Sequence, residues 1–211
     1  MVDTLILPGL NGSGEAHWQR IWSRERPHCR VLEQENWACP DLRQWRERLE
    51  EELSASDSVV LVAHSLGCIL AASLAWSPYA RKIRGALLVA PCDMKKVEEL
   101  HPCAVHLDRF PDEPLPFPSL VIGSANDPYM DPASLQRHST LWGTDVKSLG
   151  AVGHINIASG FGRWSQGYAI FDDFIERLNH REPPATPLKR ATVRTDFKSA
   201  VADPTLSLIP N

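Results

Sequence analysis

The stretch at residues 58–67, SVVLVAHSLG, constrains the fold of this chain more than any other part of its sequence. It begins with β-branched and apolar residues, which is typical of a strand buried on both faces of a parallel sheet. A small residue, a serine and a glycine end the strand, and an apolar, alanine-rich segment up to Trp76 predicts a buried helix. A strand and a helix joined by a sharp turn around a serine form the layout of a nucleophile elbow, G-x-S-x-G, here with Ala63 in place of the first glycine.

The chemistry of an activated serine explains that layout. A serine hydroxyl is a weak nucleophile, so it must project from the turn toward a general base and toward backbone N–H groups that bind an oxyanion. Ser65 is therefore the candidate nucleophile, and the backbone N–H of Leu66 is a candidate oxyanion donor.

A glycine-rich segment follows the first predicted strand, at residues 4–7. It reads PGLNGSG at residues 8–14, and either a phosphate-binding loop or a loop that supplies an oxyanion donor would need such backbone freedom. The Lys-Ser/Thr pair of a P-loop is missing, and the glycine spacing differs from that of a dinucleotide fingerprint. An oxyanion loop with the Leu10 N–H as donor is the better interpretation, and a purely structural turn is the alternative.

Strand-like and helix-like segments alternate along most of the chain. Strands are predicted at residues 4–7, 30–34, 58–64, 85–90, 119–123 and 146–149, and helices at 17–22, 40–53, 66–76, 132–141 and 164–178. The alternation predicts a single α/β domain at residues 1–180, with about six mostly parallel strands and helices on both faces. Residues 94–118 are expected to form an irregular surface segment near the site, and residues 181–211 a disordered or loosely packed tail.

Composition and charge exclude several classes of protein. The 211 residues carry a net charge of −4, which offers no electrostatic footprint for nucleic acid or an anionic membrane. No apolar run approaches the length of a membrane span and no basic leader precedes the first strand, so a cytoplasmic protein is expected. The five cysteines include no C-x-x-C pair, which favours free thiols over disulfides or zinc at these positions: Cys29, Cys39, Cys68, Cys92 and Cys103.

Two further residues complete a candidate catalytic triad. Asp127 and His154 each follow a predicted strand, so both are expected at the same edge of the sheet as Ser65. The acid would hold the imidazole in the required tautomer, and the imidazole would take the proton of the serine. Nucleophile, acid and histidine in this chain order are typical of α/β-hydrolases, which makes that fold the expected one.

The remaining acids and histidines fit the site less well. Asp93 and Asp131 are alternatives to Asp127, although Asp93 is also placed to cap the helical turn that follows it. His64 is expected to pack against the site rather than to react, because the turn directs its side chain away from that of Ser65. No ligand spacing such as H-E-x-x-H is present, so no metal site is predicted.

These motifs resemble those of a known family. The segments LPGLNGSG at residues 7–14, AHSLG at 63–67, NDPY at 126–129 and GHINIASGFG at 153–162 are similar to those of the small serine hydrolases of the YdeN type, which include the human retinoblastoma-binding serine hydrolase. The resemblance covers about residues 3–180. It implies a compact α/β-hydrolase without a large lid domain, in which Ser65, Asp127 and His154 match the triad of the family. Arg163 stands where bacterial relatives often carry proline, which affects the expected local shape of the pocket.

The sequence therefore predicts a serine hydrolase that acts on a small-molecule acyl substrate, a carboxylic ester, thioester or amide, without a cofactor. Trp142, Phe161 and Trp164 are candidates for the substrate pocket, and burial in the core is an equally open interpretation of these aromatic residues. A non-catalytic binding module that keeps the hydrolase fold is the alternative function, because a fold does not fix a function. A protein partner is compatible with that alternative but is not indicated by any motif.

Overall fold

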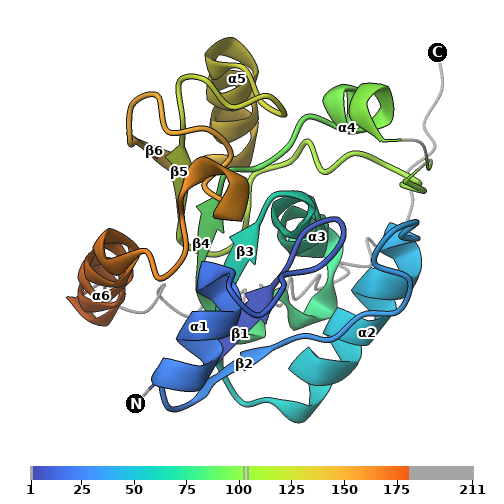
Figure 1. The fold of residues 1–211 in the computed structure, drawn as a ribbon. Helices are drawn as coiled ribbons and strands as arrows, with labels where there is room; N and C mark the ends of the chain where they lie inside the picture. Colours follow the sequence, from blue (N-terminus) through green and yellow to red (C-terminus); the bar gives the residue numbers. More distant parts are fainter. Residues whose placement is uncertain (1, 102, 104, 181–211) are drawn as a thin grey trace, which may run out of the picture. The chain divides into compact units, whose positions relative to one another are not determined.

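A six-stranded parallel sheet forms the centre of the fold in this computed structural model, which describes residues 2–101, 103 and 105–180 (Figure 1). The strands lie in the order β2-β1-β3-β4-β5-β6, and every neighbouring pair is parallel. Their bounds are β1 Thr4–Leu7, β2 Cys29–Val31, β3 Val59–His64, β4 Ile83–Val89, β5 Ser119–Gly123 and β6 Asp145–Ser148. The predicted α/β architecture is confirmed, and the predicted tail at residues 181–211 lies outside the described residues.

Helices cover both faces of this sheet (Figure 1). One face is covered by α1 (Trp18–Glu25) and α6 (Ser165–His180), and the other by α2 (Leu42–Ala55), α3 (Leu66–Ser73) and α5 (Pro132–Trp142). The short helix α4 (Met94–Leu100) follows β4, and 3₁₀ turns lie at Leu74–Trp76, Pro78–Lys82 and Ile157–Ser159.

Successive residues of the inner strands alternate between two hydrophobic layers. In β1, Leu5 and Leu7 belong to the layer formed with α2 and α3, whereas Ile6 belongs to the layer formed with α1 and α6. In β3, Leu61 and Val62 divide between the layers in the same way. Because both faces are apolar, these strands appear in the sequence as unbroken hydrophobic runs, and this is why they could be predicted.

The amphipathic helix predicted after Pro40 is α2. Its N-cap is Asp41, whose carboxylate accepts the backbone N–H of Arg43 at 2.9 Å. One face of the helix is buried against the sheet by the side chains at the predicted spacing: Leu42, Trp45, Leu49 and Leu53.

Most predicted boundaries differ from the observed ones by one to three residues. The helix expected to reach Trp76 ends at Ser73, and a 3₁₀ turn continues the chain to Trp76. The last strand begins at Asp145, one residue earlier than predicted, and all its residues are exposed. The segment up to Trp76 is almost entirely apolar, so its pattern does not mark where the α-helix gives way to the 3₁₀ turn, and β6 has a single apolar residue, Val146, so its pattern does not mark where the strand begins.

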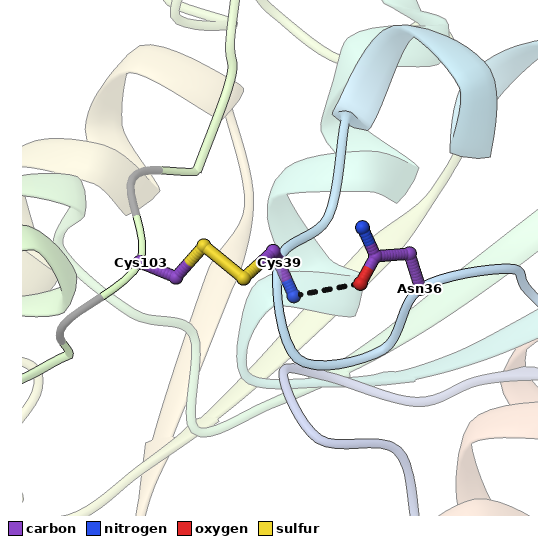
Figure 2. Close-up of a disulfide and its surroundings, with 3 residues drawn as sticks. All are labelled: Asn36, Cys39 and Cys103. Atoms are coloured by element: carbon purple, nitrogen blue, oxygen red, sulfur yellow. Dashed lines mark hydrogen bonds between the residues drawn. A yellow bond between two sulfur atoms is a disulfide. The ribbon is translucent and has the colours of Figure 1, made fainter.

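The expectation of free thiols is wrong for one pair of cysteines. Cys39 and Cys103 form a disulfide between positions 64 residues apart in the sequence, with their Cα atoms 5.5 Å apart (Figure 2). The side-chain oxygen of Asn36 accepts the N–H of Cys39 at 3.2 Å and holds the turn that presents this cysteine. Sequence spacing held no signal for the pair, because only the fold brings the two segments together. The other cysteines are free and buried, as predicted: Cys29, Cys68 and Cys92.

A short parallel bridge ties the same two segments together. The N–H of Leu42 donates to the carbonyl oxygen of His106 at 3.0 Å, and the N–H of His106 donates to the carbonyl oxygen of Pro40 at 3.2 Å. The chain after α4 is therefore attached to the start of α2 both covalently and through the backbone.

Candidate active site

Ser65 lies in the turn between β3 and α3, at the carboxyl end of a central strand. Its backbone angles are φ 54° and ψ −121°, a region that residues other than glycine rarely adopt. This is the strained turn that a nucleophile elbow requires, since it projects the serine side chain beyond the sheet edge.

Two glycines let the loop after β1 approach that turn. A Cβ on Gly67 would lie 2.3 Å from the carbonyl oxygen of Leu7, and a Cβ on Gly9 would lie 2.8 Å from the Cβ of Ser65. Neither separation is sterically allowed, so the loop and the turn pack backbone against backbone only because both residues are glycine. The contact brings Leu10 to the wall of the same pocket as Ser65.

The three predicted triad residues are brought together. His154 Nε2 lies 2.9 Å from Ser65 Oγ, and His154 Nδ1 lies 2.9 and 2.8 Å from the two carboxylate oxygens of Asp127. Asp127 comes from the loop after β5 and His154 from the loop after β6. All three residues are buried, so water competes little for these hydrogen bonds.

Backbone groups hold the acid and the histidine in place. The N–H of Tyr129 donates to Asp127 Oδ1 at 2.9 Å and holds the carboxylate, both of whose oxygens lie within hydrogen-bond distance of His154 Nδ1. The side-chain oxygen of Asn126 accepts the N–H of Gly153 at 2.7 Å and so joins the loop of the acid to the loop of His154.

The alternative acids serve as helix caps. Asp93 accepts the N–H of Lys95 at 2.9 Å and caps α4, and Asp131 accepts the N–H of Ser134 at 2.9 Å and caps α5. Of the three candidate acids, Asp127 is the one whose carboxylate bonds to His154 within the described residues.

His64 supports the site from behind. Its Nε2 donates to the backbone oxygen of His154 at 2.9 Å, and the two ring centroids are 4.9 Å apart. Burial, followed by the nearby imidazoles of His154 and His17, lowers the pKa of His64 well below its ordinary value. His64 is therefore a neutral donor at neutral pH and helps to orient the backbone that carries His154.

The predicted oxyanion donors have free N–H groups. Within the described part of the chain, the backbone N–H groups of Leu10 and Leu66 have no hydrogen-bond partner. Leu66 is the first residue of α3, where an N–H has no acceptor inside the helix. Both residues belong to the two segments that the glycine contact joins, which is the placement an oxyanion site needs.

Ser65 and His154 line a pocket with a volume of about 270 Å³. Most of its other wall residues belong to the motif segments of the sequence, although few of them were predicted individually as wall residues. The glycine-rich segment at residues 8–14, His64, the NDPY segment and the GHINIASGFG segment supply nine of them: Leu10, Asn11, Gly12, Gly14, His64, Tyr129, Asn156, Ile157 and Ala158. Three wall residues lie outside these motifs, and no local pattern indicated them: His17, Val97 and His101.

The three aromatic residues considered for the pocket are not among the residues that line it. Trp142 is buried in the layer with α2 and α3, and its Nε1 donates to the carbonyl oxygen of Pro111 at 2.6 Å. Trp164 stacks on Trp22 with ring centroids 5.8 Å apart, and Phe161 packs edge-on against Trp164 at 5.8 Å. Their packing agrees with the alternative interpretation, aromatic residues of the hydrophobic layers.

No group of three or more His, Cys, Asp or Glu side chains in the described residues is arranged to hold a metal ion. No described helix combines the length and the apolar composition needed to cross a bilayer.

Comparison with protein families identifies a model described as "Serine hydrolase", which matches residues 4–173. This range contains Ser65, Asp127 and His154, and it covers the whole of the sheet. Comparison with curated proteins finds no match.

Solved structures show a similar fold. A YdeN-like hydrolase from Pectobacterium atrosepticum SCRI1043 is 32% identical, with a TM-score of 0.75, over 84% of this chain and 92% of that one. The ydeN gene product from B. subtilis is 17% identical, with a TM-score of 0.66, over 83% of this chain and 100% of that one. A thermophilic esterase from Thermogutta terrifontis is 14% identical, with a TM-score of 0.61, over 84% and 90% of the two chains. The last two likenesses concern the fold alone.

Proposed function

The chain belongs to the serine hydrolase family, and from this premise we propose that it cleaves a carboxylic ester, thioester or amide through a Ser-His-Asp triad and an acyl-enzyme intermediate. Among these reactions we propose carboxylic ester hydrolysis, as in a carboxylesterase, and the experiments below use ester substrates. The observation that carries the proposal is the unbroken chain of hydrogen bonds from Ser65 Oγ through the His154 imidazole to Asp127.

In the acylation step, Ser65 Oγ attacks the acyl carbon while His154 Nε2 takes the hydroxyl proton. Asp127 accepts the Nδ1–H of His154, which keeps Nε2 free as the base and stabilises the imidazolium that forms. The negative charge that develops on the carbonyl oxygen is met by the N–H groups of Leu10 and Leu66. Each such donor is typically worth about 3 kcal/mol in the transition state.

Acylation ends when the imidazolium of His154 gives its proton to the leaving alcohol, thiol or amine, whose bond to the acyl carbon breaks. In the deacylation step, the neutral Nε2 takes a proton from a water molecule that attacks the acyl carbon of the acyl-enzyme, and His154 then returns this proton to Ser65 Oγ as the ester bond breaks. The acid is released and Ser65 regains its proton. No step requires a cofactor. We propose a small-molecule acyl compound as the substrate.

Covalent labelling tests this function directly. A fluorophosphonate should modify Ser65 in the wild type, and Ser65→Ala should lose both the label and p-nitrophenyl acetate hydrolysis while keeping its melting temperature. Ser73→Ala is the matched control, because Ser73 Oγ donates to Leu70 within α3 and lies outside the pocket. Labelling that survives in Ser65→Ala refutes the assignment, and a wild type that takes no label supports a binding module instead.

The cytoplasm remains the proposed compartment. Cytoplasmic reductants keep most thiols reduced, so Cys39 and Cys103 would be found there as a dithiol rather than as the disulfide of the structure. Counting the thiols of protein from freshly lysed cells, quenched with acid, distinguishes the two states and thereby tests the compartment.

A further inference from the structure

A row of three imidazoles runs along the floor of the pocket. The ring centroids of His17 and His64 are 5.0 Å apart, and those of His64 and His154 are 4.9 Å apart. His154 is the proposed base and His64 holds its backbone. The proposed mechanism gives no task to His17, although this residue lines the pocket together with Ser65.

The hydrogen bonds of His17 define its tautomer. His17 is the N-cap of α1, and its Nδ1 accepts the backbone N–H of Gln19 at 3.2 Å. A nitrogen that accepts carries no proton, so in the neutral ring the proton lies on Nε2. Within the described residues this Nε2–H has no hydrogen-bond partner, and the ring borders the pocket. A free donor of fixed position is thus available to a bound molecule.

The surroundings keep this donor uncharged. Burial, and secondly the nearby charge that His154 carries when protonated, lower the pKa of His17 to about 4. At neutral pH the ring is therefore a neutral donor, which suits a neutral acceptor better than a carboxylate.

The other residues that line the pocket also favour an uncharged substrate. Among the described residues that line it there is no Asp, Glu, Lys or Arg, so it offers no partner for a charged substrate. Its volume of about 270 Å³ is small. The Tyr129 hydroxyl lies 3.3 Å from His101 Nε2, and Asn156 Oδ1 accepts the N–H of Ser159 at 3.1 Å, so both of these oxygen atoms have a partner within the protein.

We propose that His17 is a substrate-binding residue whose Nε2–H donates a hydrogen bond to an ether or hydroxyl oxygen close to the scissile bond of a small, uncharged ester. This inference rests on the proposed function and adds the substrate class. The acceptor oxygen belongs either to the acyl group or to the alcohol, and the experiment below has one arm for each.

Two pairs of isosteric esters measure the effect. In the acyl arm, p-nitrophenyl methoxyacetate is compared with p-nitrophenyl butyrate, and in the alcohol arm, 2-methoxyethyl acetate is compared with butyl acetate. Within each pair one methylene is replaced by oxygen. The ratio of the two kcat/KM values is the discrimination, and comparing this ratio between variants cancels the intrinsic reactivity of the esters.

Two variants distinguish the capping role of His17 Nδ1 from the proposed substrate-binding role of His17 Nε2. His17→Asn places an acceptor where Nδ1 caps the helix but has no donor that reaches the Nε2 position. His17→Gln places an amide N–H near the Nε2 position and loses the cap. We expect His17→Asn to keep its melting temperature and to lose about tenfold in discrimination in one arm, the effect of one hydrogen bond. We expect His17→Gln to melt earlier and to keep most of the discrimination. Ser77→Ala removes the cap of the 3₁₀ turn at Pro78–Lys82, none of whose residues lines the pocket, and should keep the wild-type ratio.

The outcomes separate this inference from the function on which it rests. Discrimination that is unchanged in His17→Asn in both arms overturns the inference, and so does discrimination that follows the melting temperature, because His17 would then act only as a cap. In either case hydrolysis by the wild type leaves the proposed function intact. A wild type that hydrolyses none of the four esters and takes no fluorophosphonate refutes the proposed function, and this inference with it.

Discussion

The Ser65 turn and the segment between α4 and β5 both border the pocket, but they are held by different means. The turn joins β3 to α3, and β3 is paired with β1 on one side and β4 on the other. The second segment follows α4, which supplies Val97 to the pocket wall, and begins with His101, a further wall residue. It is attached to the start of α2 by the Cys39–Cys103 disulfide (Figure 2) and by the backbone bridge between His106 and Asp41.

Because of this difference, the residues proposed to react and the wall residues that contact the substrate should respond differently to mutation. The atoms proposed to react are fixed by strand pairing and by backbone contacts, which tolerate little displacement. The part of the wall formed by α4 and His101 is held by one crosslink, by the cap of α4 and by a few hydrogen bonds, which can change without moving the sheet. Changes at the first region should therefore affect the rate of bond cleavage, and changes at the second should affect stability and binding of substrate.

The largest expected effect concerns the acid. Asp127→Asn keeps the shape of the side chain but disfavours the productive tautomer of His154. In a serine protease, the same Asp→Asn change at the catalytic acid lowers kcat by about 10⁴-fold. We expect a loss of that order for Asp127→Asn. Asp93→Asn and Asp131→Asn, which alter the caps of α4 and α5, should lose less than about tenfold. Steady-state kinetics with p-nitrophenyl acetate provide the measurement, and a crippled Asp93→Asn would overturn the assignment of the acid.

The same contrast explains what could be predicted from the sequence. Ser65 and Asp127 each follow a buried strand and His154 follows the exposed edge strand β6, and the carboxyl ends of parallel strands meet at one edge, so local patterns were enough to bring these residues together. The Cys39–Cys103 pair and the pocket donor His17 depend on contacts between segments that no local pattern relates.

Aromatic residues were the hardest to place, for a related reason. The hydrophobicity of Trp142 favours a pocket and a core equally, and the position of its ring is decided by the carbonyl oxygen of Pro111, 31 residues away in the sequence. A sequence pattern carries no information about that contact.

The second effect concerns the crosslink. Closing a loop of this length removes unfolded-chain entropy worth about 4 kcal/mol in the loop-entropy model, so Cys39→Ser should lower the free energy of unfolding by up to about that amount. Because the crosslink holds the wall that carries His101, KM should rise more than kcat falls. Urea denaturation and ester kinetics measure the two quantities.

A reductant supplies the control for that prediction. Dithiothreitol should lower the melting temperature of the wild type and leave that of Cys39→Ser unchanged. Titration of five thiols in denatured, non-reduced protein would show that the crosslink does not form, and would remove the contrast between the two regions.

The third effect is a dependence of stability on pH that originates at the floor of the pocket. The unfolded chain protonates His17 near pH 6.5, whereas the folded protein keeps it neutral down to about pH 4. The unfolded state therefore binds more protons between these values, and the free energy of unfolding decreases as the pH falls through this window. For His17 the loss approaches about 3 kcal/mol at the acid end, and His64 shifts in the same direction. Denaturation curves at pH 7 and pH 5 should show a smaller difference for His17→Asn than for the wild type; equal differences would contradict the assignment.

The smallest effect tests the backbone contact that holds the Ser65 turn. Gly67 lies in α3, and alanine in a helix is favoured over glycine by about 1 kcal/mol, so propensity alone predicts that Gly67→Ala stabilises the protein. The new methyl group would instead lie 2.3 Å from the Leu7 carbonyl oxygen and 2.7 Å from that of Pro8, which are backbone atoms of a buried strand and its loop. Overpacking of this kind costs about 1–3 kcal/mol, so we expect a net loss of about 1 kcal/mol and slower fluorophosphonate labelling, because the Leu66 N–H shifts away from the oxyanion. Gly162→Ala is the matched control, since its methyl group would meet nothing closer than 3.9 Å and its φ is not positive. A Gly67→Ala variant that is as stable and as reactive as the control would show that the turn does not depend on this contact.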